Sequence, residues 1–161
     1  MLKSSFIKTL IFFSFCFVGW LSHAQESTEK SSGAIHVEVK TKSGKKLALQ
    51  KDSVICRLFR KSTQFPNGTV PVSDVVKSKQ DSVGSIVKCD FNNLSPGTYA
   101  VTVFHDQNNN GKLDTDDVGF PKEPYGFSNN ARNRTFGPPT FKDVSVLVKD
   151  AVVKVEIKIG L

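Results

Sequence analysis

Apolar and polar residues alternate along most of the chain after residue 33. The alternation runs through these segments: Ala34–Lys40, Ser53–Arg60, Ser85–Phe91, Thr98–His105, Phe141–Val148 and Val152–Ile159. A period of two is typical of a strand with one face in a core, and turn-forming clusters such as Ser95-Pro96-Gly97 separate the segments. No long amphipathic helix interrupts them. The pattern predicts an all-β fold, a single antiparallel β-sandwich of about seven strands.

Two long stretches lack this alternation. Residues 61–84 are polar and poorly periodic, so we expect a long connection there with one edge strand around Val70–Val76. The second stretch, Tyr125–Phe141, is too long for an ordinary hairpin turn and is rich in aromatic residues, glycine and proline. Loops of this length within a domain are usually either functional or packed on themselves.

The first residues predict export. Lys3 and Lys8 precede a short apolar run, Leu10–Leu21, and Ser22-His23-Ala24 places small residues at the positions that determine cleavage. We interpret residues 1–24 as a signal peptide cleaved after Ala24, which makes the protein secreted or periplasmic. Residues 25–33 are polar and predict a disordered leader, with the sandwich domain over 34–161. No later apolar stretch is long enough to span a membrane, so none is expected in the mature chain.

The segment after Thr98–His105 has the spacing of a calcium-binding loop. Counted from Asp106, oxygen ligands fall at the positions that calcium loops use, from Asp106, Asn108, Asn110, the Lys112 carbonyl, Asp114 and Asp117. Gly111 falls where such a loop turns sharply. We therefore expect a Ca²⁺ site in a loop without flanking helices, similar to those of dockerins and thrombospondin-type repeats. The last ligand is Asp in place of Glu, which predicts an affinity on the order of 10⁻⁵ to 10⁻³ M. The alternative is a solvated Asn/Asp/Gly turn.

Cys56 and Cys89 remain after removal of the signal peptide. Each alternates with apolar neighbours, so both side chains are expected to point into the core. An exported protein can form a disulfide between them. Two separate buried thiols fit the pattern equally well, because geometry decides between the two arrangements.

Charge and catalytic motifs add little. The net charge is +7, but the cations are scattered among acidic residues without a basic block, so nucleic-acid binding is not expected. His105 ends a predicted core strand, where a hydrogen-bonded spacer is the ordinary role. No serine or aspartate lies in a nucleophile motif or beside a plausible base, and the spacing of the aspartates is better explained by the cation. The sequence therefore predicts a protein that is not an enzyme.

The aromatic-rich stretch Tyr125–Phe141, called the aromatic loop below, allows two interpretations. In the first, Tyr125, Phe127, Asn129, Asn130 and Phe136 form a binding platform for a sugar or an extended peptide. In the second, which we favour, the phenylalanines close the end of the sandwich and the asparagines cap backbone groups. A packed loop can still present Tyr125 outward.

Two motifs carry a family resemblance. The segment Leu94–Tyr99 (LSPGTY) is similar to the turn that enters a strand in prealbumin-like and carboxypeptidase-regulatory-like sandwiches. The runs HDQNNNGKLD, YGFSNNA and FGPPTF resemble the exported bacterial family known as domain of unknown function 2141, with the densest likeness between Leu94 and Asp143. The resemblance implies a secreted Ig-like or prealbumin-like sandwich and no particular activity. The stretch Asn130–Phe136 is longer than the family's compact form.

These observations predict an exported, calcium-stabilised β-sandwich that acts as a non-catalytic binding or surface-interaction module. Its partner is expected to be a glycan, a peptide or an envelope protein. A structural envelope subunit and a hydrolase are the alternative functions.

Overall fold

The computed structural model describes residues 32–45, 47, 49, 52–60, 62, 65–66, 73–77, 82–83 and 86–161. Their strands are β1 (Gly33–Thr41), β2 (Ser53–Phe59), β3 (Ser73–Lys77), β4 (Ser82–Val83), β5 (Ile86–Leu94), β6 (Gly97–Asp106), β7 (Tyr125–Phe127), β8 (Val146–Val148) and β9 (Val152–Ile159). A short 3-10 helix, Ser128–Asn130, follows β7. The predicted signal peptide and nearly all of the predicted leader lie outside the described residues.

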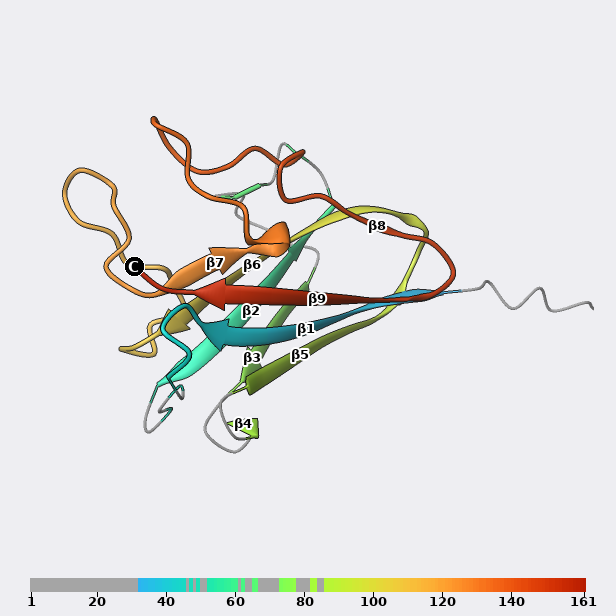
Figure 1. Cartoon of the computed structure of the whole chain (residues 1–161), viewed down its shortest axis with the longest axis horizontal. Helices are drawn as coiled ribbons and strands as arrows, with labels where there is room; N and C mark the ends of the chain where they lie inside the picture. Colours follow the sequence, from blue (N-terminus) through green and yellow to red (C-terminus); the bar gives the residue numbers. More distant parts are fainter. Residues whose placement is uncertain are drawn as a thin grey trace, which may run out of the picture.

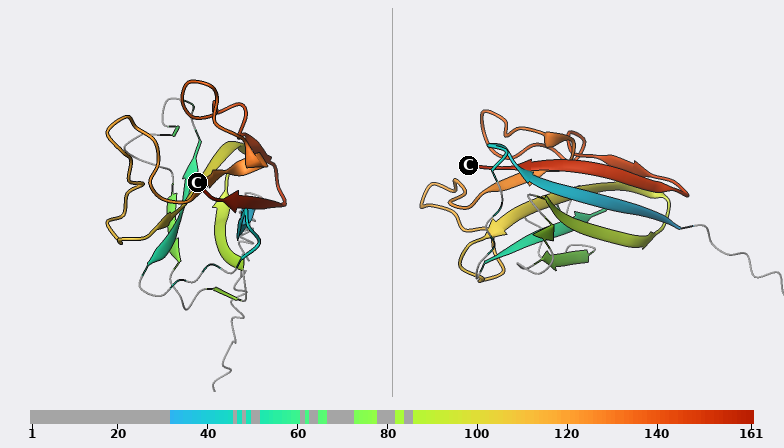
Figure 2. Two further views of the ribbon diagram at one scale, coloured as in Figure 1. Left: turned by 60° about the vertical axis from the view of Figure 1, so that its left-hand side comes forward. Right: turned by 60° about the horizontal axis from the view of Figure 1, so that its bottom comes forward.

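The strands form two sheets that face each other (Figures 1 and 2). One sheet has the order β4-β5-β1-β9, and the other has the order β3-β2-β6-β7 with β8 also paired to β6. The all-β, two-sheet fold is confirmed. One pairing departs from the antiparallel expectation, since β1 and β9 run parallel and side by side.

The core lies between the sheets. Alternate residues of β1 and β5, such as Val37 and Val87, meet alternate residues of β2 and β6, such as Val54 and Val101, and all four are buried. Full burial of such a side chain contributes about 1.5–3 kcal/mol. The sandwich is therefore held mainly by the faces that the alternation predicts.

A disulfide crosses this core. Cys56 of β2 and Cys89 of β5 are both fully buried and are bonded to each other, with a Cα–Cα distance of 6.5 Å. The sequence allowed either a bond or two thiols. The bond joins one sheet to the other.

The segment Phe141–Val148 differs from its predicted strand. Only Val146–Val148 pairs in the sheet, because residues 141–144 form a turn. The Asp143 carboxylate accepts hydrogen bonds from the Thr140 hydroxyl (2.6 Å) and the Thr140 N–H (2.8 Å). These bonds lower the pKa of Asp143 below its usual value. The local side-chain bonds hold the turn, which competes with extended backbone.

Strand β6 is buried on both faces. Val101 and Val103 face the main core, whereas Ala100 belongs to a second apolar cluster with Phe59, Phe127 and Val144. Residues of the long loop after β7 thus cover the outer face of the second sheet. Among the residues described, none belongs to a helix with the length and hydrophobicity that a membrane crossing requires.

Candidate functional site

The segment between β6 and β7 contains the predicted calcium-binding residues and is called the acidic loop below. It starts at the end of β6 with a buried carboxylate. Asp106 is 1% exposed, and its two oxygens accept hydrogen bonds from the backbone N–H groups of Asn110 (3.1 Å) and Gly111 (2.8 Å). Asn109 and Gly111 have φ values of 58° and 76°, which let the chain turn back toward Asp106. Asp106 therefore sets the shape of the loop.

Two amide side chains of the loop point toward its second acidic residue, Asp114. Asn108 and Asn110 donate hydrogen bonds from their Nδ2 atoms to the Asp114 carboxylate, at 2.6 Å and 2.9 Å. Their Oδ1 atoms accept backbone N–H groups, those of Asn110 and Lys112 respectively. The two amides thus stabilise the negative charge of Asp114 by donating hydrogen bonds to it.

A tight turn then reverses the chain. Asp116 accepts hydrogen bonds from the N–H groups of Val118 and Phe120, and the reversal brings the Lys122 N–H within 2.8 Å of the Asp114 carbonyl. Gly119 in this turn has a φ of 88°. Asp117 is exposed in the same turn.

The reversal places Glu123 against the loop. The sequence pattern did not identify this residue. Glu123 is 3% exposed. Its Oε1 accepts the Gln107 N–H at 2.7 Å, and its Oε2 accepts the Asp114 N–H at 3.1 Å. Both Glu123 and Asp106 are therefore carboxylates that hold the loop through its backbone.

The structure brings together most of the predicted metal ligands. Asp106, Asn108, Asn110 and Asp114 are linked by the hydrogen bonds above, whereas Asp117 lies in the exposed turn. Within the described part of the chain, no group of three or more His, Cys, Asp or Glu side chains is arranged to hold a metal ion.

Two contacts connect the loop to the second sheet. Arg57 of β2 donates a hydrogen bond from Nη2 to the Gly111 carbonyl (2.7 Å), and its guanidinium lies over the Phe104 ring, 5.1 Å from the centroid. His105 is 8% exposed, with Nε2 2.5 Å from Asp52 Oδ2. These contacts fix the loop relative to β2 and β6.

The predicted binding residues of the aromatic loop separate into different roles. Phe127 is 7% exposed and packs edge-on against Phe65 and Tyr125. Asn129 donates hydrogen bonds to the carbonyls of Asp143 and Ser145. Asn130 bonds to the backbone of β9, donating to the Glu156 carbonyl and accepting the Lys158 N–H. These three side chains hold the loop in place.

Ser128, within the YGFSNNA motif, is a second residue that the pattern did not identify. Its hydroxyl accepts the Val101 N–H (3.0 Å) and donates to the Val144 carbonyl (2.5 Å) in a fully buried position. It satisfies one backbone group of β6 and one of the loop before β8.

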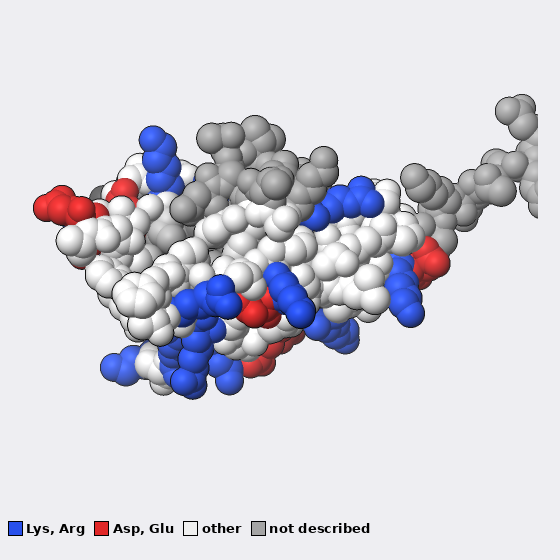
Figure 3. All heavy atoms as spheres, turned by 90° about the horizontal axis from the view of Figure 1, so that it is seen from above, with Lys and Arg blue, Asp and Glu red and all other residues white. Residues whose placement is uncertain are grey.

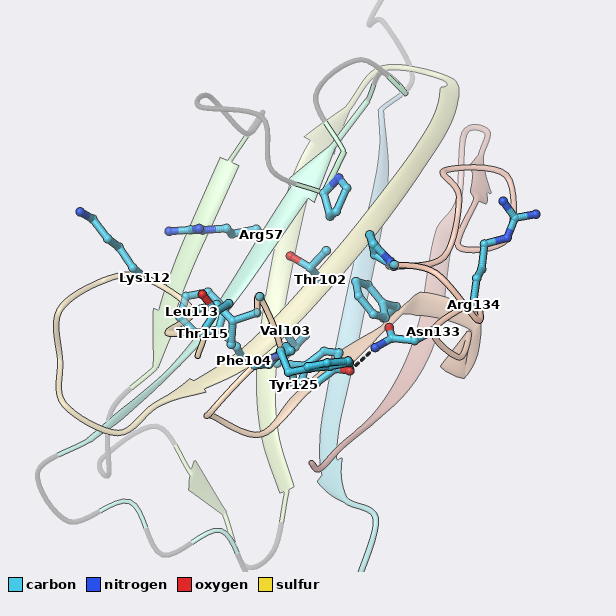
Figure 4. A pocket seen from close by; sticks show the side chains of 18 of the residues that line it. Arg57, Thr102, Val103, Phe104, Lys112, Leu113, Thr115, Tyr125, Asn133 and Arg134 are labelled. Carbon is cyan, nitrogen blue, oxygen red and sulfur yellow. Dashed lines mark hydrogen bonds between the residues drawn. The ribbon is translucent and has the colours of Figure 1, made fainter. Parts of the chain in front are cut away.

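Tyr125 and Phe136 border a cleft of about 580 Å³ between the acidic loop and the aromatic loop. Its base comes from β6 and β7, and Asn133 donates a 2.5 Å hydrogen bond to the Tyr125 hydroxyl there (Figure 4). Three side chains on its walls are largely exposed: Val118 (77%), Phe120 (66%) and Phe136 (94%). These three side chains give the cleft an exposed apolar surface.

The charged groups of the cleft have one sign. The described residues that line it include Arg57, Lys112 and Arg134 and no aspartate or glutamate. Arg57 and Lys112 lie on one side of the cleft and Arg134 on the other (Figure 4). On the face drawn in Figure 3, Lys and Arg side chains are interspersed with acidic groups.

Sequence signals account for only part of this cleft. Tyr125 and Phe136 were candidates because aromatic residues concentrate in one loop. Val118 and Phe120 are a weaker signal, because they are only two apolar residues in a polar turn. The sequence pattern around Arg57 indicates an ordinary outward-facing residue of β2.

Comparison with known proteins gives one match. No curated protein and no solved structure matches the chain. A family model does, over residues 45–156, which include the acidic loop, the aromatic loop and every strand except β1, although the match ends within β9. The chain therefore belongs to the family described as "Uncharacterized protein conserved in bacteria (DUF2141)".

Proposed function

We propose that this protein is an exported, non-catalytic binding module, stabilised by calcium at the acidic loop, whose ligand occupies the adjoining cleft. The observation that carries the proposal is the pair of exposed aromatic side chains, Phe120 and Phe136, on facing walls of one cleft. A cleft of this size lies within the usual range for ligand sites, about 300–1,000 Å³.

The chemistry of the loop fits calcium. Asp106 and Asp114 carry carboxylates in this loop, the Glu123 carboxylate accepts the Asp114 N–H, and Asn108 and Asn110 carry amide oxygens. Hard oxygen ligands of this kind are those that calcium takes. Glu123, as the longer and buried carboxylate, is better placed than exposed Asp117 to serve as the last ligand. A bound ion would offset the repulsion between these carboxylates.

Binding requires one local rearrangement. Asn108 and Asn110 now direct their Nδ2 atoms at Asp114. Rotation of each amide would direct its oxygen inward instead. This requirement agrees with the modest affinity that the ligand set predicts.

The loop and the cleft share residues, so the ion would support the ligand site. Lys112 to Pro121 form one wall of the cleft, and Arg57 joins that wall to β2 through the Gly111 carbonyl. Holding this wall rigid reduces the entropy lost when a ligand binds.

A positional role for His105 is consistent with a non-catalytic module. The ring is almost fully buried, and its Nε2 is engaged with Asp52. A general base has to reach a proton of its substrate.

Thermal unfolding tests the calcium part of the proposal. We expect the melting temperature of the protein to rise in 10 mM CaCl₂ relative to EGTA. Asp106→Ala should remove this rise, because it removes a ligand and two backbone hydrogen bonds. Asp150→Ala, an exposed aspartate in the turn between β8 and β9, is the matched control and should keep it. The same melting temperature in CaCl₂ and in EGTA for the natural protein would contradict the proposal.

Ligand screening tests the binding part. Pull-down from envelope extracts and glycan-array screening, each with and without calcium, should give a ligand whose binding falls in Tyr125→Ala. A ligand that binds Tyr125→Ala as well as the natural protein would lie outside the cleft and contradict the assignment.

A further inference from the structure

The cleft combines apolar walls with charges of one sign. Val118 and Phe120 stand on the acidic-loop wall and Phe136 stands on the aromatic-loop wall, all largely exposed. Their side chains have no hydrogen-bonding atoms, so they favour hydrocarbon or aromatic parts of a ligand.

The cations occupy the margins of this apolar surface. Lys112 and Arg134 are exposed and lie on opposite sides of the cleft (Figure 4). The positive charge of Arg134 also helps to lower the pKa of Asp143. The Arg57 guanidinium donates a hydrogen bond to the Gly111 carbonyl. Lys112 and Arg134 are therefore the two cations best able to meet an anionic group.

A neutral glycan would use little of this surface. Sugar hydroxyls need many hydrogen-bonding partners, and the three most exposed side chains of the walls, Val118, Phe120 and Phe136, supply none, although Thr115, Asn133 and Thr135 also line the cleft. A cationic ligand would face only positive charge among the described lining residues. An apolar body with an acidic group uses both features, because the body covers the aromatic side chains and the acid faces the cations.

We propose, building on the function proposed above, that the cleft binds a small amphiphilic anion, an alkyl or aromatic body carrying a carboxylate or sulfonate. The body lies between Phe120 and Phe136, and the acidic group contacts Lys112 or Arg134. The cleft volume of about 580 Å³ is enough for a single such molecule.

A pair of fluorescent probes tests this assignment on the intact protein. 8-Anilinonaphthalene-1-sulfonate (ANS) and N-phenyl-1-naphthylamine (NPN) share a ring system, and only ANS carries a charge. We expect ANS to bind more tightly than NPN in low salt and to lose that advantage in 1 M NaCl.

Single substitutions separate the two contributions. Lys112→Gln and Arg134→Gln should each weaken ANS about two- to five-fold, as expected for one exposed charge contact, and leave NPN unchanged. Phe136→Ala and Phe120→Ala should weaken both probes about five-fold or more. These side chains are exposed, so the variants should fold. Lys149→Gln and Leu147→Ala change an exposed cation and an exposed apolar residue outside the cleft, and should change neither probe.

Competition identifies the ligand class. Decanoate should displace ANS, decanol should displace it more weakly, and a galacturonate trimer should not. Displacement by the trimer in preference to decanoate would overturn the proposal in favour of an acidic glycan. Equal binding of ANS and NPN, unaffected by Lys112→Gln and Arg134→Gln, would overturn the anion assignment and leave the cleft as a binding site. Binding of neither probe would overturn this inference, whereas the proposed binding function would fail only if the pull-down and glycan-array screening also gave no ligand.

Discussion

At the scale of single residues, Asp106 and Glu123 matter because they are carboxylates buried beside backbone N–H groups. Each accepts two such hydrogen bonds, and together they connect Gln107, Asn110, Gly111 and Asp114. A buried carboxylate without partners would cost several kcal/mol. The loop therefore has its shape from its own hydrogen bonds, and a cation would add to a scaffold that already exists.

Glu123→Gln tests which carboxylate completes the calcium site. It should remove most of the calcium-dependent rise in melting temperature, because a neutral amide is a weaker ligand for a hard cation. It should also lower the free energy of unfolding without calcium by about 1–3 kcal/mol. The amide NH₂ that replaces one carboxylate oxygen cannot accept a hydrogen bond, so one buried backbone N–H loses its acceptor. Differential scanning calorimetry in CaCl₂ and in EGTA measures both effects.

Asp117→Asn is the matched variant for this experiment. It removes one carboxylate from the same loop at an exposed position and should keep the calcium response. If Asp117→Asn abolishes the response and Glu123→Gln keeps it, the twelfth-position ligand is Asp117 and our assignment of Glu123 is wrong.

The candidate site was predictable from sequence as far as its contacts are local. Asp106 to Asp114 lie within one short loop, so their spacing alone identifies them. Glu123 is outside the twelve-residue pattern, because the turn at Asp116–Phe120 folds it back. Arg57 comes from another strand, and no local pattern could show that its side chain reaches Gly111.

At the scale of elements, strands were easier to predict than their pairing. Val152–Ile159 forms a strand with the expected bounds, because alternation is a local property. The parallel pairing of β9 with β1 brings together residues more than 100 positions apart. Lys40 and Glu156, for example, are separated by 116 positions and are joined by a side-chain hydrogen bond. Phe141–Val148 shows the opposite case, in which the Thr140–Asp143 bonds replace the first half of an alternating strand with a turn.

The parallel pair carries an ion pair whose effect depends on pH. Lys40 Nζ lies 2.5 Å from Glu156 Oε2, and their hydrogen bond is the main cause that lowers the pKa of Glu156 and raises the pKa of Lys40. Glu156 therefore stabilises the fold above its unfolded pKa of 4.5, and this is lost as the pH falls through its lower folded pKa. The Lys40 contribution is complete below 10.5 and is lost as the pH rises through its higher folded pKa.

Glu156→Gln should reveal this pH window. The variant should melt slightly below the natural protein between about pH 4.5 and pH 10.5, and the difference should disappear as the pH falls through the lower folded pKa of Glu156 or rises through the higher folded pKa of Lys40. The difference should be small and should shrink in 1 M NaCl, because both side chains are exposed. Glu38→Gln is a control at a more distant carboxylate, 3.9 Å from Lys40. A difference that persists at pH 2 would contradict the ion-pair origin.

At the scale of the whole molecule, the sequence predicted the class of fold and the burial of both cysteines, but not how the sheets are assembled. Strands with alternating apolar and polar residues can bury their apolar faces in several different strand orders. The alternation therefore does not determine the order of the strands in each sheet. Cys56 and Cys89 were both expected in the core, yet only the arrangement of β2 opposite β5 brings them together. The disulfide thus links the two halves of a core that is otherwise held by apolar packing.

Removal of this disulfide should lower the stability of the entire sandwich. The bond closes a sequence separation of 33 residues, for which the loss of chain entropy in the unfolded state predicts about 3–4 kcal/mol. Guanidinium unfolding of the protein with and without a phosphine reductant, added under denaturing conditions because both sulfurs are buried, should show this difference. Cys56→Ala/Cys89→Ala should unfold at a still lower concentration, because it also loses packing around two buried side chains. Equal unfolding midpoints with and without the reductant, or two free thiols found by mass spectrometry in the purified protein, would show that the sheets are held together without a covalent link.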